Sequence, residues 1–269
     1  RGRVVGLDKF GHSLWRASST DGGSNPIHTH VMKLLRALLL IGWTAICCGI
    51  GLVVVMVRKD AANWVLMRIG RNLWSTRMMR WTGTNRFEAR GPGAEAIPAQ
   101  AIFIANHCSF LDINALFAFL HRPIVFLAKA SLRKVPLLGG VNARVGTVFV
   151  KRGNLQDSIR AVKALKRSFD KGRSVVVFPE GTRSRTGEML SFKKGAFHLA
   201  HAAGEPVIPV YIAGTHHVLR SGGFLVNKGP IRVYVGEPVP PSSQVEAFMR
   251  AGEQAVRDLK ALAQAESLQ

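Results

Sequence analysis

The sequence predicts an α/β fold, a mixed sheet flanked by helices, preceded by an N-terminal hydrophobic helical segment that anchors the chain to a membrane. Two patterns support this prediction. An uncharged run of 21 residues, Ala37 to Val57, lies near the N-terminus, and short apolar runs alternate with helical ones after Gly93. With 269 residues, 47% of them hydrophobic, the chain can bury a core of this kind, which excludes a disordered protein.

The organisation of the chain follows from these patterns. Residues 1–30 show no periodicity and are expected to form a disordered tail. Residues 31–85 are expected to form membrane-anchoring helices, and residues 86–269 a single α/β domain. The uncharged run has basic residues at both ends and the length of a membrane span, yet a buried core helix or a monotopic anchor has a similar pattern. Its flanking charges give no orientation.

A second helix is predicted from Trp64 to Trp81, with an apolar arc opposite a polar one. Tryptophan and arginine on such a helix suit a membrane interface, and a helix docked on the α/β domain would show the same arc. Within the domain we expect strands at residues 101–105, 124–128, 147–150, 174–178, 207–212 and 231–235, and helices at residues 155–170, 193–203 and near the C-terminus.

The charge balance is strongly basic, with 37 Lys and Arg against 16 Asp and Glu and a formal net charge of +21. Such a surface attracts nucleic acid or the anionic face of a membrane, and composition alone does not choose between them. The three cysteines, Cys47, Cys48 and Cys108, form no CxxC pair, and no histidines cluster at metal-ligand spacing. We therefore expect no disulfide and no bound metal.

The first candidate for catalysis is His107, which follows a predicted strand. A neutral imidazole can take the proton from a hydroxyl group as that group attacks a carbonyl carbon. Asp112, five residues later, can accept a hydrogen bond from the other ring nitrogen and fix the tautomer. Cys108 lies between them, but its sequence context gives no sign of a nucleophile, and a small packed residue is expected.

A second cluster, Glu180-Gly181-Thr182-Arg183, follows another predicted strand. Its glycine permits close approach of the backbone to a ligand, and the guanidinium of Arg183 can bind phosphate through two parallel hydrogen bonds. A simple turn would also explain this run. Lys129 and Arg152 follow two more predicted strands and can converge with Arg183 on one anion, although single surface cations are usually only solvated.

In order and spacing, these segments resemble the four motifs of the glycerol-phosphate and lysophospholipid acyltransferase superfamily. The greatest likeness is to bacterial 1-acylglycerol-3-phosphate acyltransferases, and it spans about residues 95–240. One departure is Lys151, where members often have Asp. The matching segments are Asn106-His107-x4-Asp112, Gly146-x-x-Phe149-x-x-Arg152, Phe178-Pro179-Glu180-Gly181-Thr182-Arg183-Ser184 and Val207-Ile208-Pro209-Val210.

The resemblance implies a role for each matching residue. His107 would be the general base and Asp112 its orienting partner. Pro209 would take part in acyl-donor binding or shape the site. The acceptor would be held by two groups: Glu180, Gly181 and Thr182 at its glycerol portion, and Arg152, Arg183 and the supporting Lys129 at its phosphate.

The resemblance also implies the reaction and its setting. The acceptor would be lysophosphatidic acid, acylated at its sn-2 hydroxyl to phosphatidic acid, with acyl-CoA or acyl-carrier protein as co-substrate and no cofactor. The enzyme would act at a membrane, expected to be the bacterial inner membrane with the site on the cytoplasmic side. Alternatives are another lysolipid acceptor such as lyso-ornithine lipid, glycerol phosphate itself and, remotely, a basic membrane-tethered protein that binds nucleic acid.

Overall fold

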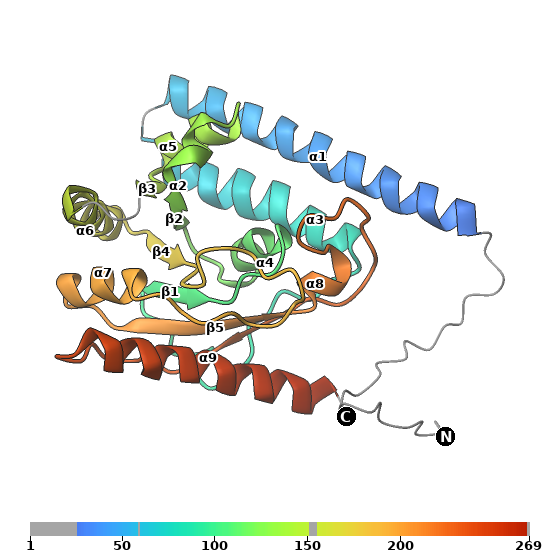
Figure 1. Cartoon of the computed structure of the whole chain (residues 1–269). Coiled ribbons are helices and arrows are strands. Elements are labelled where there is room, and N and C mark those ends of the chain that lie inside the picture. Colours follow the sequence, from blue (N-terminus) through green and yellow to red (C-terminus); the bar gives the residue numbers. More distant parts are fainter. Residues whose placement is uncertain (1–25, 59, 151–154, 268–269) are drawn as a thin grey trace.

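A computed structural model describes residues 26–58, 60–150 and 155–267, and its centre is a six-stranded sheet with the order β3-β2-β4-β1-β5-β6 (Figure 1). Five strands run parallel, and β6 is antiparallel to β5. The predicted mixed sheet is thus confirmed. The strands are β1 (Ile102–Ala105), β2 (Ile124–Lys129), β3 (Val148–Val150), β4 (Ser174–Val177), β5 (Val207–Ala213) and β6 (Arg232–Val235).

Helices cover both faces of this sheet, which explains why the central strands are apolar without alternation. Helix α9 packs along β5 on one face, next to α7, and α4 lies on the other face beneath the N-terminal helices (Figure 1). The helices of the domain are α4 (Leu111–Phe119), α5 (Leu138–Val145), α6 (Leu155–Asp170), α7 (Gly195–Ala203), α8 (Thr215–Val218) and α9 (Val245–Ser267), with a 3₁₀ turn η2 (Ala130–Lys134).

Helix α4 has no counterpart in the sequence prediction. Eight of its nine residues are buried, so its sequence has no polar face and lacks the amphipathic period that reveals a surface helix. This helix is nonetheless the element that carries Asp112 in its first turn.

The N-terminal region forms two long helical segments. Helix α1 spans Pro26–Val57, and the second segment runs without a break through α2 (Ala62–Trp64), a π-helical stretch η1 (Val65–Ser75) and α3 (Thr76–Trp81). Residues 26–30, which we assigned to the tail, therefore belong to α1. Proline suits the first turn of a helix because its missing N–H would have no partner there. The rest of the predicted tail, residues 1–25, lies outside the described residues.

Both N-terminal segments pack on the α/β domain. The second segment lies between α1 and α4, as the docked alternative requires. The indole N–H of Trp43 donates to the Leu73 carbonyl at 3.2 Å, and that of Trp74 donates to Thr44 Oγ1 at 3.0 Å. Along α1 the buried side chains are Ala37, Leu40, Cys47 and Val55.

Candidate active site

The predicted functional segments meet at one edge of the sheet. Because β1, β2 and β4 are parallel, the residues that follow them emerge on the same side. His107 follows β1 at the centre, Phe178 follows β4 next to it, and Lys129 ends β2. The topology therefore brings together segments that are up to 73 residues apart in sequence.

The centre of the site is a hydrogen-bonded pair of His107 and Asp112. The distance from His107 Nδ1 to Asp112 Oδ2 is 2.8 Å, and the aspartate side chain is fully buried while the imidazole is 16% exposed. A carboxylate only accepts hydrogen bonds, so Nδ1 carries the proton and Nε2 has a free lone pair. The predicted meeting of these two side chains is present in the fold.

Asp112 accepts three further short hydrogen bonds, besides a weak one from the Cys108 thiol at 3.9 Å. The backbone N–H groups of Cys108 and Ser109 each donate to Oδ2 at 2.8 Å. The hydroxyl of Thr215, buried at the start of α8, donates to Oδ1 at 2.6 Å. These bonds stabilise the ionised carboxylate inside the protein and fix its orientation toward His107.

Sequence reasoning missed Thr215. It lies 103 residues from Asp112, beyond the reach of local patterns. The available signal was Gly214, which follows a predicted strand and adopts a left-handed backbone with φ of 89°. A Cβ there would lie 2.2 Å from the Pro230 carbonyl oxygen, so the turn that presents Thr215 requires glycine.

The imidazole is also fixed by stacking. The ring of His107 lies parallel to that of Phe178, with centroids 3.9 Å apart and an angle of 13° between the planes. The His107 carbonyl accepts a hydrogen bond from the Ser184 N–H at 2.8 Å. Within the described part of the chain, no hydrogen bond involves Nε2, so this nitrogen can accept a proton from a substrate hydroxyl.

Glu180 occupies a different place from the one expected. Its side chain is buried, and its two oxygens accept hydrogen bonds from the backbone N–H groups of His107 at 2.8 Å and Leu190 at 3.1 Å. It joins the His107 loop to the loop after β4, and each of its two oxygens accepts one of these backbone hydrogen bonds. Burial raises the pKa of Glu180 to about 7, against the opposing effect of these two amides and of Arg257.

The other predicted ligand-binding residues differ in how the structure places them. Gly181 has a left-handed backbone with φ of 74°, and Thr182 and Arg183 after it are exposed. Arg183 makes no hydrogen bond or ion pair with the described residues, which leaves its guanidinium available to an anion. Lys129 is exposed at the end of β2. Arg152 lies outside the described residues.

Residues of the first and fourth motifs join β1 to β5. The Asn106 side chain donates to the Ile212 carbonyl at 3.1 Å and accepts from the Ile212 N–H at 2.7 Å, so it extends the pairing of the two strands beyond Ala105. Pro209 is buried within β5, paired with Ile104. It lines neither of the two cavities discussed below, and its role in acyl-donor binding or in shaping the site stays a prediction.

Cys108 is a buried, packed residue, as expected. Burial and the neighbouring Asp112 raise the pKa of its thiol to about 12. Only the thiolate is an effective nucleophile, so this sulfur is inert at neutral pH. Acyl transfer through this cysteine is therefore disfavoured.

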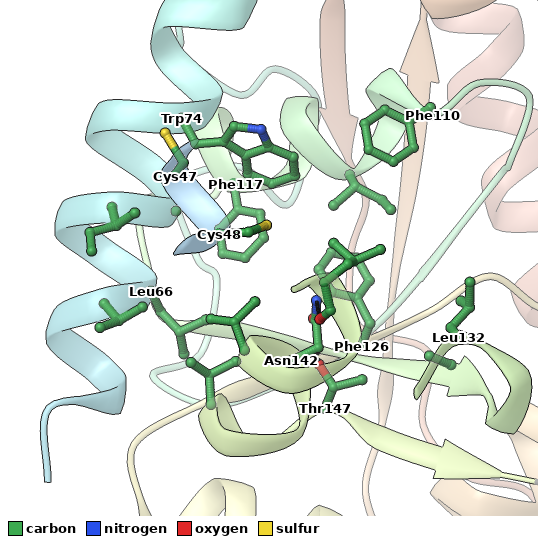
Figure 2. Close-up of a pocket in the computed structure, with 18 of the residues that line it drawn as sticks. Cys47, Cys48, Leu66, Trp74, Phe110, Phe117, Phe126, Leu132, Asn142 and Thr147 are labelled. Carbon is green, nitrogen blue, oxygen red and sulfur yellow. Dashed lines mark hydrogen bonds between the residues drawn. The ribbon is translucent and has the colours of Figure 1, made fainter. Parts of the chain in front are cut away.

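An apolar cavity of about 140 Å³ is lined by side chains that include Trp74, Phe117 and Phe126 (Figure 2). It lies between η1, α4, α5 and β2, and its wall includes Phe126, whose ring stacks on Phe178 at 6.0 Å. Its two amide and hydroxyl side chains, Asn142 and Thr147, bond to each other at 2.9 Å. The aromatic stack from Phe126 through Phe178 therefore leads from this cavity to His107.

Comparison with known proteins shows similarity to acyltransferases. Residues 89–213 match the family model described as Acyltransferase. The chain is 35% identical to the chloroplastic 1-acyl-sn-glycerol-3-phosphate acyltransferase LPAT1 of Arabidopsis thaliana, over 55% of this chain and 42% of that protein. It is 28% identical to the 1-acyl-sn-glycerol-3-phosphate acyltransferase of Haemophilus influenzae, over 82% of this chain and 90% of that protein.

A solved structure has the same fold. The 1-acyl-sn-glycerophosphate acyltransferase PlsC of Thermotoga maritima superimposes with a TM-score of 0.72 at 29% identity, over 87% of this chain and 97% of that one. The fold and these matches make the chain similar to the Acyltransferase family over residues 89–213 and to 1-acyl-sn-glycerol-3-phosphate acyltransferases over more of its length. The relatives described are all named as acyltransferases of 1-acyl-sn-glycerol-3-phosphate, although the chain spans less than half of the Arabidopsis protein.

Proposed function

We propose that this protein transfers a fatty acyl group from a thioester, acyl-CoA or acyl-carrier protein, to the sn-2 hydroxyl of lysophosphatidic acid and so forms phosphatidic acid. The observation that carries the proposal is the buried carboxylate that orients His107 beside an apolar cavity. The names of the relatives support the acceptor.

The proposed chemistry needs one base and no acyl-enzyme. Nε2 of His107 takes the hydroxyl proton while the oxygen attacks the thioester carbonyl, and Asp112 stabilises the imidazolium that forms. The C–S bond then breaks, and the imidazolium returns the proton to the departing thiolate. The products are a two-chain phospholipid and a free thiol. General-base catalysis of this kind contributes about 100- to 10,000-fold.

Binding of the two substrates follows from charge and polarity. Arg183 is exposed at the edge of the site, and with Lys129 and Arg152 it would bind the acceptor's phosphate. The apolar cavity would take the donor's acyl chain, because each buried methylene contributes about 0.8 kcal/mol. Gly181 and Thr182 would border the glycerol portion.

The structure also supports a monotopic membrane anchor. Among the described residues, α1 is long and apolar enough to cross a bilayer from His30 to Val57. Its buried side chains extend from Ala37 to Val55, so η1 and the domain together cover one side of α1 over about 27 Å, nearly the bilayer core. A crossing helix would draw the domain into the lipid. We therefore propose that α1 lies in one leaflet of the membrane, taken to be the cytoplasmic leaflet of a bacterial inner membrane.

The decisive experiment is an acyl-transfer assay with lysophosphatidic acid and several acyl thioesters, repeated with His107→Ala. We expect the variant to lose at least about 100-fold in kcat while its thermal unfolding is unchanged. The rate with lysophosphatidic acid is compared with the rates for acceptors that lack phosphate or carry an ornithine headgroup. Arg183→Ala should reduce the difference in rate between the acceptors with and without phosphate. Substantial acyl transfer by His107→Ala would reject His107 as the general base. Preference for a phosphate-free acceptor would reject lysophosphatidic acid as the acceptor.

A further inference from the structure

A second apolar cavity, of about 380 Å³, adjoins the first and shares part of its lining. It is bounded by the middle of α1, the segment before α5 and the loop after α8. Both cavities are lined by Cys48, Phe110 and Leu138, so these three side chains form the partition between them. We call the cavity near β2 the inner cavity and this second one the outer groove.

The outer groove reaches the catalytic loop. Phe110 and Leu111, which line it, come directly after the His107-Cys108-Ser109 turn. The Ser109 hydroxyl donates to the carbonyl of Leu219, another lining residue, at 2.7 Å. A chain seated in the groove therefore ends near the same histidine that the inner cavity approaches through Phe178.

The rim of the groove is apolar and exposed. Phe224 is 72% exposed, Leu137 is 45% exposed, and both line the groove together with residues of α1. Leu137 has a left-handed backbone with φ of 58°, which is strained for a branched side chain and marks a conformation maintained by its surroundings. Exposed apolar side chains around a groove favour entry from lipid rather than from water.

The charge around the groove favours an anionic occupant. Among the segments that line the groove, the start of α4 contains one acidic residue, the buried Asp112. The other lining segments contain none, and they are residues 26–57, 62–81, 113–150 and 206–236. Arg36 borders the groove and donates to the Val226 carbonyl, while Lys134 and Arg220 are sequence neighbours of the lining residues Val135 and Leu219. An anionic lipid in the same leaflet would be attracted to this rim.

We propose that the outer groove binds the acyl chain of the acceptor lysolipid, while the inner cavity binds that of the donor. This inference rests on the proposed function, because that reaction brings together two substrates with one chain each. The acceptor resides in the membrane and would enter sideways through the exposed rim. Separate cavities would let the enzyme select the two chains independently.

Matched variants test this assignment. Ala45 lines only the outer groove, and Ala128 lines only the inner cavity. We expect Ala45→Trp to lower kcat/KM for long-chain acceptors relative to short ones, by about fourfold per excluded methylene, without altering the order of donor preference. Ala128→Leu should shift donor preference and leave acceptor preference as it was. A shift in donor preference by Ala45→Trp, or no shift by either variant, would overturn the proposal.

Photolabelling of the unaltered protein gives an independent measure. Lysophosphatidic acid with a diazirine at the end of its chain should label residues 135–138 or 219–226, and acyl-CoA with the same group should label residues 65–74 or 141–149. Equal labelling of the groove by a diacyl phosphatidylcholine probe would show general lipid contact and overturn the proposal. If the unaltered protein acylates no lysolipid, the proposed function fails, whatever the labelling pattern.

Discussion

At the scale of single residues, the pair of His107 and Asp112 depends on a hydroxyl that the motifs do not include. Thr215 is the side-chain donor to the Oδ1 atom of Asp112, with the Cys108 sulfur more distant at 3.9 Å. Removing this donor leaves part of a buried carboxylate without a strong hydrogen bond, which costs about 1–3 kcal/mol. The orientation of His107 is then less well determined.

We therefore expect Thr215→Val to lower kcat by roughly 10- to 100-fold with little change in KM, because the substrate does not contact this residue. Thr215→Ser keeps the hydroxyl and should retain most of the activity. The measurement is the pH profile of kcat/KM for both variants. A Thr215→Val enzyme with an unaltered profile and rate would show that the hydroxyl only packs.

Glu180 makes stability depend on pH. Its pKa is about 7 in the folded protein against an ordinary value of 4.5, so between these values the folded state binds more protons than the unfolded one. The stabilisation that protonated Glu180 gives to the folded state is complete below pH 4.5 and is lost as the pH rises through about 7. The free energy of unfolding should fall by roughly 3 kcal/mol over this range on account of this group.

The test compares the unaltered protein with Glu180→Gln in urea denaturation at several pH values. The glutamine does not titrate, so the difference in unfolding free energy between the two proteins should change from pH 4.5 to 7. The Glu180→Gln enzyme should also remain weakly active, because the glutamine oxygen can still accept one of the two backbone hydrogen bonds, from His107 or from Leu190. Parallel pH curves for the two proteins would contradict a raised pKa.

At the scale of elements, the turn from β5 into α8 determines where Thr215 lies. Gly214→Ala adds a Cβ 2.2 Å from the Pro230 carbonyl oxygen, in a backbone conformation with φ of 89°. We expect a loss of roughly 2–4 kcal/mol in stability and a larger loss of activity than for Thr215→Val. Gly204→Ala is the control, because φ is 74° there but no atom lies within 4 Å of the added Cβ.

Gly204→Ala should lower the free energy of unfolding by only about 1 kcal/mol and leave the rate of acyl transfer unchanged, because Gly204 ends α7 away from the site. Thermal unfolding and initial rates separate the two effects. If Gly214→Ala and Gly204→Ala lose stability equally and keep full activity, the turn has no part in positioning Asp112.

At the scale of the whole molecule, the side of the membrane on which each end of α1 lies distinguishes the two topologies. Val31 and Val57 near its two ends are 56% and 79% exposed. With the native cysteines replaced, single cysteines at these positions should react together with a membrane-impermeant maleimide, or be protected together, in sealed vesicles from expressing cells. Labelling of one end alone from each side would show a spanning helix.

Much of this molecule follows from local patterns. The period of the apolar residues locates six strands and the long helices, and the segment from residue 155 to 170 is helical over its predicted length. Local patterns also indicate His107 and Asp112, because the five-residue spacing places a carboxylate on the first turn of the helix that follows the strand.

Tertiary structure alone decided the rest. The support of Asp112 by Thr215, the burial of Glu180 and the two cavities all arise between segments far apart in sequence. Helix α4 has no polar face to reveal it, because it is enclosed on every side by partners that only folding supplies. Sequence alone thus indicated the α/β fold and the candidate pair of His107 and Asp112, since these depend on local periods and spacings, while the four motifs indicated the class of protein by resemblance. The support of that pair and the shape of the two cavities depend on packing, which no local pattern records.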